Sequence, residues 1–428
     1  MAEIATPSLS TTDPDYRAAL RRRRNAADLR LRLYGIAAIT VAIGLLAILI
    51  FTLVLGGYQA FTQTHVRVDF PISEENVDAE DIAAGNWRAV TSEAVEMLFP
   101  ELEDPAQLRT AGQILTNNTQ FLVRDAVLRN PSVIGDTLTL EVPASDPYDQ
   151  LSKGVIDRDL PETRRRVSDE QIALFDHLAT EGRVSKPFNW GLFFNADSRF
   201  PELAGLAGAI TGSFYALLVC FVISFPVGIA AAIYLEEFAP KNRLTDIIEV
   251  NINNLAAVPS IVFGLLGLAV FLQVFGLPRS APLVGGLVLA LMTLPTIIIV
   301  TRNSLKAVPP SIREAALGMG ASRHQVILHH VLPLAIPGIL TGTIIGLAQA
   351  LGETAPLLLI GMNAFITSPP GGLMEASTAL PTQIFIWADS PERGFVARTS
   401  AGILVLLGFL IVMNGIAIFL RQRLQRTW

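Results

Sequence analysis

The segment Ser311–Pro333 has the sequence SIREAALGMGASRHQVILHHVLP and is the only extended amphipathic stretch in the apolar C-terminal half of the chain. Ser311 lies three residues before Glu314, and Ser322 lies three residues before Gln325. This is the spacing of a capping box, in which two side chains satisfy the first backbone amides of a helix. The segment therefore predicts two short helices, one beginning at each of these serines.

Small residues shape the first predicted helix and separate it from the second. Ala315 and Ala316 extend the first helix and let another surface approach it closely. Gly318 and Gly320 follow, and glycine is the usual residue where a helix ends. Pro333 is expected to close the second helix. The predicted structure is a pair of short helices joined by a glycine bend.

The composition of the chain is that of a membrane protein. Of the 428 residues, 51% are hydrophobic and only 16% are charged, whereas about 25% of the residues in a soluble domain are charged. The single cysteine, Cys220, lies in an apolar run, which excludes an internal disulfide and argues against a cysteine-based metal site. No basic domain with interleaved aromatic residues is present, so nucleic-acid binding has no support.

Six apolar runs are long enough to cross a bilayer, whose hydrocarbon core needs about 20 helical residues. In chain order they cover 34–55, 206–235, 247–275, 282–301, 334–362 and 400–420. The first run exceeds the ~7–15 apolar residues of a cleaved signal peptide. We therefore expect it to be an uncleaved anchor.

Residues 58–203 contain no apolar run of this length and carry 25 acidic against 13 basic residues. A capping box at 168–171 predicts a helix, and alternation at 137–142 predicts a strand. We expect a small mixed α/β domain outside the membrane. Its acidic surface leaves its role open between a solvated structural domain and a docking surface for a partner.

The positions of the basic residues predict the orientation in the membrane. Residues 1–33 are rich in arginine, which holds that end of the chain in the cytoplasm. Six spans then place both termini in the cytoplasm, together with the loops at 236–246 and 302–333, which both carry Lys or Arg. The cytoplasmic tail at 421–428 is basic as well.

The predicted fold class is an all-α membrane protein with six transmembrane helices. One helix, at 34–57, is an N-terminal anchor, and the other five form a core at 204–420. The α/β domain at 58–203 is expected to be extracytoplasmic, between the first and second helices.

No stretch of the chain carries the chemistry of an enzyme. None of the four lysines lies in the P-loop pattern G-x-x-x-x-G-K-[ST], so the chain has no P-loop for ATP. A nucleophile elbow and an H-E-x-x-H motif are absent too. His324, His329 and His330 cluster in the loop without further ligands that we can place. The sequence predicts no catalytic residue, no metal site and no cofactor, and any ATP hydrolysis belongs to a partner subunit.

Glu353 lies deep in the fifth apolar run, and a charge at bilayer depth costs at least ~2.5–3.5 kcal/mol on insertion scales. Gly352 and Pro356 beside it predict a broken helix. Glu353 is expected to line a translocation pathway, to pair with an arginine there, or to form a structural ion pair or cap at the break. Arg302 is its candidate partner, a candidate contact for an anion, or a positive-inside anchor.

Further polar residues in the apolar runs are candidates for the same pathway. They are Asn251 and Asn254 at the start of the third run, Ser260 in that run, and Thr354 beside Glu353. The asparagine side chains can donate hydrogen bonds to a solute or tie helices together.

The amphipathic segment resembles the EAA loop of bacterial ABC importer permeases. The matching residues are Glu314-Ala315-Ala316, then Gly320, then Leu332-Pro333, with His330 where an apolar residue is usual. In that family this loop is the cytoplasmic knob that docks into a groove on the ATPase subunit. The resemblance implies that these six residues couple the chain to an ATPase.

Three further stretches are similar to the PstA-type permeases of phosphate importers, rather than to the sister PstC type. They are 254–265, 294–298 with its continuation at 307–309, and the sequence ALGETAP at 350–356. The resemblance covers about 204–420 and does not account for the arginine-rich N-terminus or for 58–203.

The resemblance implies import of inorganic phosphate across the bacterial inner membrane by alternating access. It implies as partners a PstC-like second permease subunit, a PstB-like ATPase dimer, a PstS-like phosphate-binding protein and membrane lipid, but no nucleic acid. Two alternatives stay open: a permease for molybdate, sulfate or phosphonate, and a membrane signalling subunit with 58–203 as its sensor. The short cytoplasmic segments argue against the second.

Overall fold

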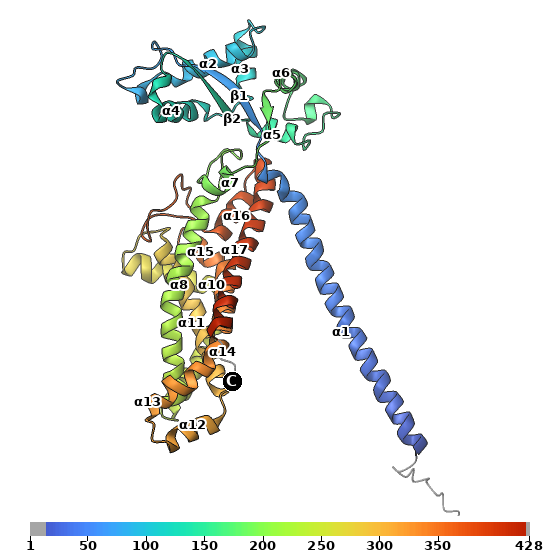
Figure 1. The fold of residues 1–428 in the computed structure, drawn as a ribbon, viewed down its shortest axis with the longest axis vertical. Coiled ribbons are helices and arrows are strands. Elements are labelled where there is room, and N and C mark those ends of the chain that lie inside the picture. Colours follow the sequence, from blue (N-terminus) through green and yellow to red (C-terminus); the bar gives the residue numbers. More distant parts are fainter. Residues whose placement is uncertain (1–13, 425–428) are drawn as a thin grey trace, which may run out of the picture. The chain divides into compact units, whose positions relative to one another are not determined.

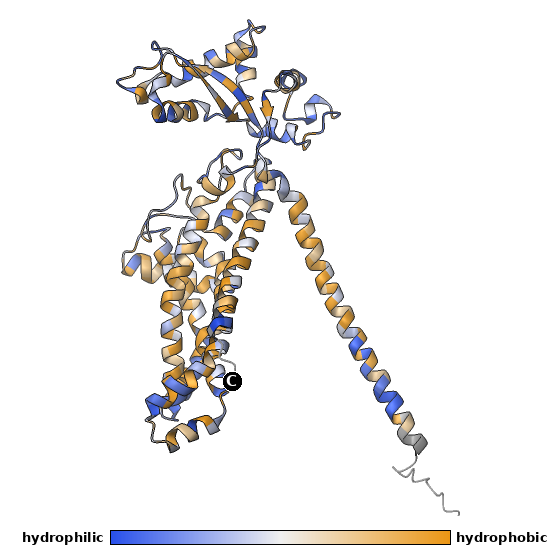
Figure 2. Ribbon diagram, in the orientation of Figure 1, coloured by the Kyte–Doolittle hydropathy of each residue, from blue (hydrophilic) through white to orange (hydrophobic). Residues whose placement is uncertain are grey.

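The computed structural model describes residues 14–424 and divides the chain into two compact units, Met1–Leu55 and Gly56–Trp428. Predictions that fall on residues 1–13 and 425–428 lie outside the described part. Among the described residues the first unit is part of α1 (Pro14–Gly57), one helix of 44 residues whose last two residues belong to the second unit. Figure 2 shows charged residues toward the N-terminal end of α1 and apolar residues along most of the remainder. The predicted first span is thus helical, and its apolar side chains are exposed, as lipid contact requires.

Residues 58–203, which we call the sheet domain, contain a three-stranded antiparallel sheet in the order β2-β1-β3. Its strands are β1 (His65–Pro71), β2 (Thr137–Pro143) and β3 (Val184–Ser185). The helices are α2 (Trp87–Leu98), α3 (Pro105–Gly112), α4 (Thr119–Arg129), α5 (Asp146–Ser152), α6 (Asp169–Thr180) and α7 (Gly191–Phe194).

The core of the sheet domain follows from alternation along β1. Val66, Val68 and Phe70 are fully buried, while the residues between them are exposed or half-buried. The buried side chains join one apolar cluster with side chains of α2, α4 and α6. The predicted strand at 137–142 and the predicted helix start at Ser168 are both confirmed, the latter with both hydrogen bonds of its capping box.

The helical core (residues 204–424) contains four single helices that are long and apolar enough to span a membrane. They are α8 (Ala207–Ile233), α11 (Pro282–Lys306), α14 (Leu332–Gly352) and α17 (Gly394–Leu424). With α1, the described chain has five such helices, or six if one bent pair counts as a span. The core also contains shorter helices, among them α15 (Ala355–Leu359) and α16 (Leu380–Ala388) (Figure 1).

The predicted third span, 247–275, is wrong as one continuous helix. The chain forms α9 (Arg243–Ala256) and then α10 (Ser260–Leu266), which continues as a π-helical stretch, η6 (Gly267–Val274), at 104° to α9. Pro259 lies between the two helices with extended backbone angles. Proline has no amide hydrogen and disfavours helical angles in the preceding residue, so the helix breaks there.

The predicted fifth span begins earlier than expected and breaks where expected. Its helix is continuous from Arg323 to Gly352, so Pro333 does not close a helix. Glu353 then adopts extended angles, and the short α15 follows. The interruption predicted from Gly352 and Pro356 is therefore confirmed.

Two glycines bring α14 into close contact with α11. A Cβ atom on Gly338 would lie 2.5 Å from Oγ of Ser304, and one on Gly342 would overlap the side chain of Val300. The glycines are four residues apart on α14, and their partners are four residues apart on α11. Small residues at this spacing let two membrane helices approach each other closely, here with side chains of α11 against the glycines of α14.

Candidate functional site

The loop that joins α11 to α14, residues 307–331, begins with α12 (Pro310–Gly318). The predicted capping box of Ser311 and Glu314 is wrong, because the helix begins at Pro310 with Pro309 as its N-cap and without a side-chain cap. Proline favours the first helical position, since its fixed φ angle suits the helix and the missing amide hydrogen has no partner there. Ser311 and Glu314 therefore already lie inside the helix.

The predicted glycine bend is confirmed at Gly320, whose φ angle is +86°. Its amide donates to the carbonyl of Leu317 at 2.9 Å, and the amide of Ala321 donates to the carbonyl of Ala316 at 3.1 Å. These two bonds form a Schellman motif, in which a residue with a positive φ angle ends the helix. Glycine adopts that angle without steric cost, which fixes the direction in which the chain leaves α12.

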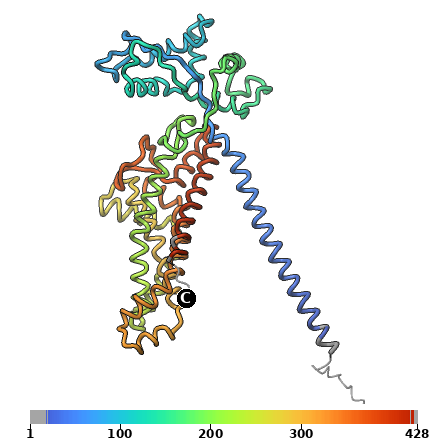
Figure 3. Tube along the Cα trace, in the orientation of Figure 1, coloured from blue at the N-terminus to red at the C-terminus, as the bar shows by residue number. Residues whose placement is uncertain are grey.

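The second predicted capping box, of Ser322 and Gln325, is confirmed by both of its hydrogen bonds. It starts α13 (Arg323–Gln325), which continues as a π-helical stretch, η7 (Val326–Val331), directly into α14. Pro333 cannot donate to a carbonyl one turn earlier, and the π-helical stretch ends two residues before it. The loop is thus one short helix followed by the start of a membrane helix. In Figures 1 and 3 both lie at one end of the helical core.

The two alanines of the loop have different surroundings. Ala316 is buried in a cluster with Leu305, Val326 and Val331, which fixes α12 against the ends of α11 and α14. Ala315 and Glu314 are exposed.

Apolar side chains are also exposed near this part of α12. Leu317, Met319 and Leu328 have exposed fractions of 49%, 79% and 51%. Leu332 and Pro333 are half-buried where α14 begins. The loop therefore combines an internally packed side with exposed apolar side chains and one exposed carboxylate.

Arg313 fixes the same loop to two other helices. Its Nη2 atom lies 2.8 Å from Oε1 of Glu237 and donates to the carbonyl of Leu305 at 2.8 Å, while Nη1 donates to the carbonyl of Val308 at 3.2 Å. Leu305 is in the last turn of α11, where carbonyl groups lack helical partners and favour a cation. Glu237 lies in the π-helical turn η5 (Tyr234–Phe238) that ends α8.

Arg302 makes a second ionic junction at this end of the core. Its Nη2 atom lies 2.6 Å from Oε1 of Glu249 in α9, and Nε lies 3.3 Å from Oε2 of Glu236 in η5. Lys306 lies 3.5 Å from the same Glu236 oxygen. The candidate pairing of Arg302 with Glu353 is therefore wrong, because two other carboxylates hold the guanidinium.

Glu353 is half-buried at the break between α14 and α15 and forms no ion pair among residues 14–424. The segment after it packs tightly on α10, since a Cβ atom on Gly264 would lie 2.7 Å from Cα of Pro356. Thr354 and Ser260 are half-buried in the same two segments. The structure thus brings together the two interrupted membrane segments, α9–α10 and α14–α15.

The asparagines of α9 do not tie helices together in the described chain. Asn251 is exposed and donates to the carbonyl of Ile247 in its own helix at 2.8 Å. Asn254 is exposed as well. Their candidacy as pathway residues is not tested by these contacts.

Sequence reasoning missed all of the ionic junctions around the loop. Glu236 and Glu237 signalled only the end of an apolar run, and Arg313 was one charge in an amphipathic segment. A usable signal was present in the sequence. Glu236 and Glu237 directly follow the second apolar run, and Arg302 directly follows the fourth. Opposite charges at the ends of two membrane runs are candidates for an ion pair.

Family comparisons divide the chain into two matching regions. Residues 224–426 match the family described as "Binding-protein-dependent transport system inner membrane component". Residues 18–162 match the family described as "Domain of unknown function (DUF3333)". Most of α1 and of the sheet domain therefore falls in a region separate from the helical core.

Curated relatives resemble the C-terminal half. The chain is 32% identical over 223 residues to the probable ABC transporter permease protein YqgI of Bacillus subtilis, covering 51% of this chain and 74% of that protein. It is 35% identical over 213 residues to the phosphate transport system permease protein PstA of Yersinia pestis, covering 50% and 71%. A solved inward-facing MetNI methionine ABC transporter is 19% identical, with a TM-score of 0.38, over 52% of this chain and 95% of that chain.

The matched family region contains the loop, the ionic junctions and both interrupted segments. The match to this chain covers more than two thirds of the length of each of these two relatives, at 30% identity or more. The chain belongs to the family of binding-protein-dependent transport system inner membrane components and is a PstA-like ABC transporter permease.

Proposed function

We propose that the chain is one of two permease subunits of an inorganic phosphate importer driven by ATP hydrolysis in a separate subunit. The relatives named as phosphate transport system permeases support phosphate as the cargo. The ALGETAP sequence at 350–356, which forms the break between α14 and α15, supports the same assignment. A PstC-like subunit, a PstB-like ATPase dimer and a PstS-like binding protein are the proposed partners.

The observation that carries the coupling role is the exposed part of the loop. Glu314 and Ala315 are exposed, as are the apolar side chains of Leu317 and Met319. Ala316 is buried and packs α12 against the rest of the core. An ATPase groove that takes this knob would bury the apolar side chains, and each Å² of apolar surface removed from water contributes about 25 cal/mol. Gly320, Leu332 and Pro333 set the shape of the knob rather than its contact surface.

The proposed pathway passes the two interrupted segments. A break in a helix leaves backbone N–H and C=O groups without helical partners. In lipid these groups cannot stay without hydrogen bonds, so a break is expected where protein or water surrounds it. Glu353, Thr354 and Ser260 are the pathway residues favoured by this argument, with Asn251 and Asn254 as outer candidates. For Arg302 we favour a structural role in the ionic junction, because two carboxylates already neutralise it.

The proposed topology keeps the boundaries expected from the sequence. Residues 1–33 and the tail 421–428 are cytoplasmic, 34–57 forms the anchor, and 302–333 is the cytoplasmic coupling loop. The sheet domain is extracytoplasmic, and 204–420 forms the permease core. Reactivity of single engineered cysteines toward a membrane-impermeant maleimide, in the Cys220→Ala background, tests each of these assignments.

Uptake of labelled phosphate in cells that lack the chain tests the cargo, with molybdate and sulfate measured in parallel. Selective loss of phosphate uptake, restored by the wild-type chain, is the expected result. Normal phosphate uptake with loss of another anion would leave the permease assignment intact and overturn the cargo.

A further inference from the structure

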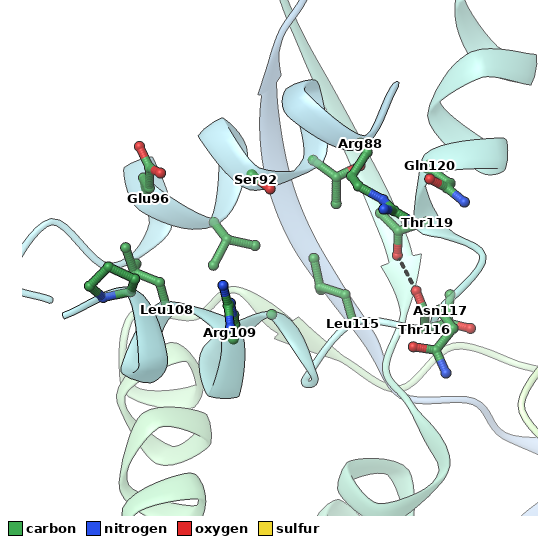
Figure 4. Close-up of a pocket in the computed structure, with 14 residues that line it drawn as sticks. Arg88, Ser92, Glu96, Leu108, Arg109, Leu115, Thr116, Asn117, Thr119 and Gln120 are labelled. Carbon is green, nitrogen blue, oxygen red and sulfur yellow. Dashed lines mark hydrogen bonds between the residues drawn. The ribbon is translucent and has the colours of Figure 1, made fainter. Parts of the chain in front are cut away.

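A cavity of about 400 Å³ opens in the sheet domain, between α2, α3 and the first turn of α4 (Figure 4). It is lined by residues of 88–96, 105–112 and 115–120, so that helices distant in sequence form a single hollow. Cavities of ~300–1,000 Å³ are the size that proteins use for small molecules. No part of the proposed transport mechanism uses this cavity.

Two arginines, Arg88 of α2 and Arg109 of α3, line this cavity without a carboxylate partner among residues 14–424. Most, but not all, of the nine other arginines of this acidic domain are paired. Six of them form ion pairs with Asp or Glu: Arg67, Arg124, Arg158, Arg165, Arg166 and Arg183. Arg129, Arg164 and Arg199 form no ion pair among the described residues either, but Arg88 and Arg109 are the two arginines that line one cavity.

The remaining lining adds neutral groups that can donate hydrogen bonds. Ser92, Asn117 and Gln120 border the cavity, and Figure 4 shows Ser92 on α2 across the hollow from Arg109. Glu96 is the one acidic residue of the lining. The cavity thus carries two positive charges, one negative charge and several neutral donors.

A second hollow of the same domain shows the opposite charge. It is lined by Glu74, Glu75, Asp78, Glu80 and Asp81, with no basic residue. The basic cavity is thus a local feature and does not follow from the overall charge of the domain.

We propose that the basic cavity binds a small molecule through a phosphoryl group, either free inorganic phosphate or a small phosphomonoester. Guanidinium groups match phosphoryl oxygens in charge and in bidentate geometry, and hydroxyl and amide donors satisfy the remaining oxygens. The volume accommodates an organic substituent as well as the anion. This site is separate from the membrane pathway and stands whether or not phosphate is the transported cargo.

Calorimetric titration of the purified full-length chain tests the proposal. The titrants are inorganic phosphate, glycerol 3-phosphate, sulfate and, as a carboxylate, citrate. The Arg88→Gln/Arg109→Gln double variant should weaken binding of the preferred phosphoryl compound at least tenfold, since it removes both guanidinium groups and their charge-assisted hydrogen bonds to the phosphoryl oxygens. The relative affinities of phosphate and glycerol 3-phosphate separate the two sources of the phosphoryl group.

Two matched variants keep the test specific. Arg164→Gln removes an exposed arginine of the same domain that lies outside the cavity, and it should leave binding unchanged. Glu96→Gln removes the repulsive charge of the lining and should tighten binding, an effect that loss of folding cannot produce. Unchanged binding in the double variant, equal loss in Arg164→Gln, or equal affinity for citrate would overturn the proposal. Phosphate uptake by cells carrying the double variant reports separately on the transport function.

Discussion

Arg313 in the loop and Glu237 at the end of α8 form an ion pair, with 2.8 Å between Nη2 and Oε1. The exposed side-chain fractions are 24% for Arg313 and 14% for Glu237. The same Nη2 atom donates to the carbonyl of Leu305 in α11. One guanidinium group therefore joins α12 to two membrane helices.

Arg313→Gln should loosen α12 without unfolding the core. Loss of hydrogen bonds to a charged group costs about 1.5–3 kcal/mol, and partial exposure places the expected loss at the lower end. Hydrogen–deuterium exchange of residues 310–318 should become faster. Lys306→Gln is the matched control, because Lys306 is 54% exposed and lies 3.5 Å from Glu236. Equal exchange in Arg313→Gln and the wild type would contradict the structural role of this pair.

Glu314→Lys should uncouple ATP hydrolysis from transport. Glu314 is exposed on α12, so reversal of its charge should leave the thermal stability of the permease unchanged while it alters the proposed contact with the ATPase. ATPase activity and phosphate uptake are measured on the same reconstituted complex. Glu103→Lys, at an exposed position of the sheet domain, controls for the change in net charge. Normal uptake with Glu314→Lys rules out the docking assignment.

Gly320→Ala should destabilise the loop through its backbone alone. The φ angle of +86° disfavours any residue with a Cβ atom, at a cost of about 1–2 kcal/mol, and no atom lies within 4 Å of the position that this Cβ would take. Gly318→Ala is the matched control, because that glycine is helical and equally free of neighbours. Alanine there should stabilise α12 by up to ~1 kcal/mol. Opposite shifts in exchange rates are expected, and shifts of the same sign would contradict the argument.

Glu353→Gln should abolish phosphate uptake and leave assembly of the complex intact. The amide has nearly the same shape as the carboxylate but no charge, so packing at the break between α14 and α15 is preserved. Uptake and co-purification of the partner subunits are the two measurements. Asp389→Asn, an exposed position after α16, is the control for loss of one charge. Normal uptake would make Glu353 a structural residue.

Glu202 should make the stability of the chain depend on pH. It is 6% exposed, accepts a hydrogen bond from Thr116 at 2.8 Å, and burial raises the pKa of its carboxyl group. As the pH rises, the Glu202 carboxyl group therefore stays protonated to a higher pH in the folded state than in the unfolded state. The resulting stabilisation is greatest below the unfolded pKa of about 4.3 and is lost as the pH rises through the folded value.

Glu202→Gln keeps a neutral group and should reduce that loss. The thermal midpoint of the variant should exceed that of the wild type at pH 7 and approach it at pH 4. Glu170→Gln, at an exposed position in the first turn of α6, should show no such pH-dependent difference. A constant difference between Glu202→Gln and the wild type from pH 4 to pH 8 would contradict the argument.

Local chemistry predicted much of the fold. The capping box at Ser322, the bend at Gly320 and the break after Gly352 are properties of a few neighbouring residues, and all three are present. The failures concern proline. Pro310 starts α12 before Ser311 can cap it, and Pro333 lies within a longer helix, just after a π-helical stretch.

Nonlocal contacts were out of reach of the same reasoning. The carboxylate partners of Arg302 and Arg313 lie between 53 and 76 residues away in the chain, and only the packing of α8, α9 and α11 selects them. The sequence shows a proline at position 259, but it does not show that the chain changes direction by 104° there. The basic cavity likewise depends on the relative positions of three helices, which cannot be read from hydrophobic periodicity in the sequence.

The close contact of Gly338 and Gly342 with Ser304 and Val300 has a mechanical consequence for the loop. Next to the loop, α11, which leads into it, and α14, which follows it, are in close contact over one helical turn. We therefore expect a pull on α12 to move these two helices together. α8 contacts α11 through a glycine in the same way, since a Cβ atom on Gly228 would lie 2.7 Å from Cγ2 of Ile297. We therefore expect any opening between helices to occur at other neighbours of this pair.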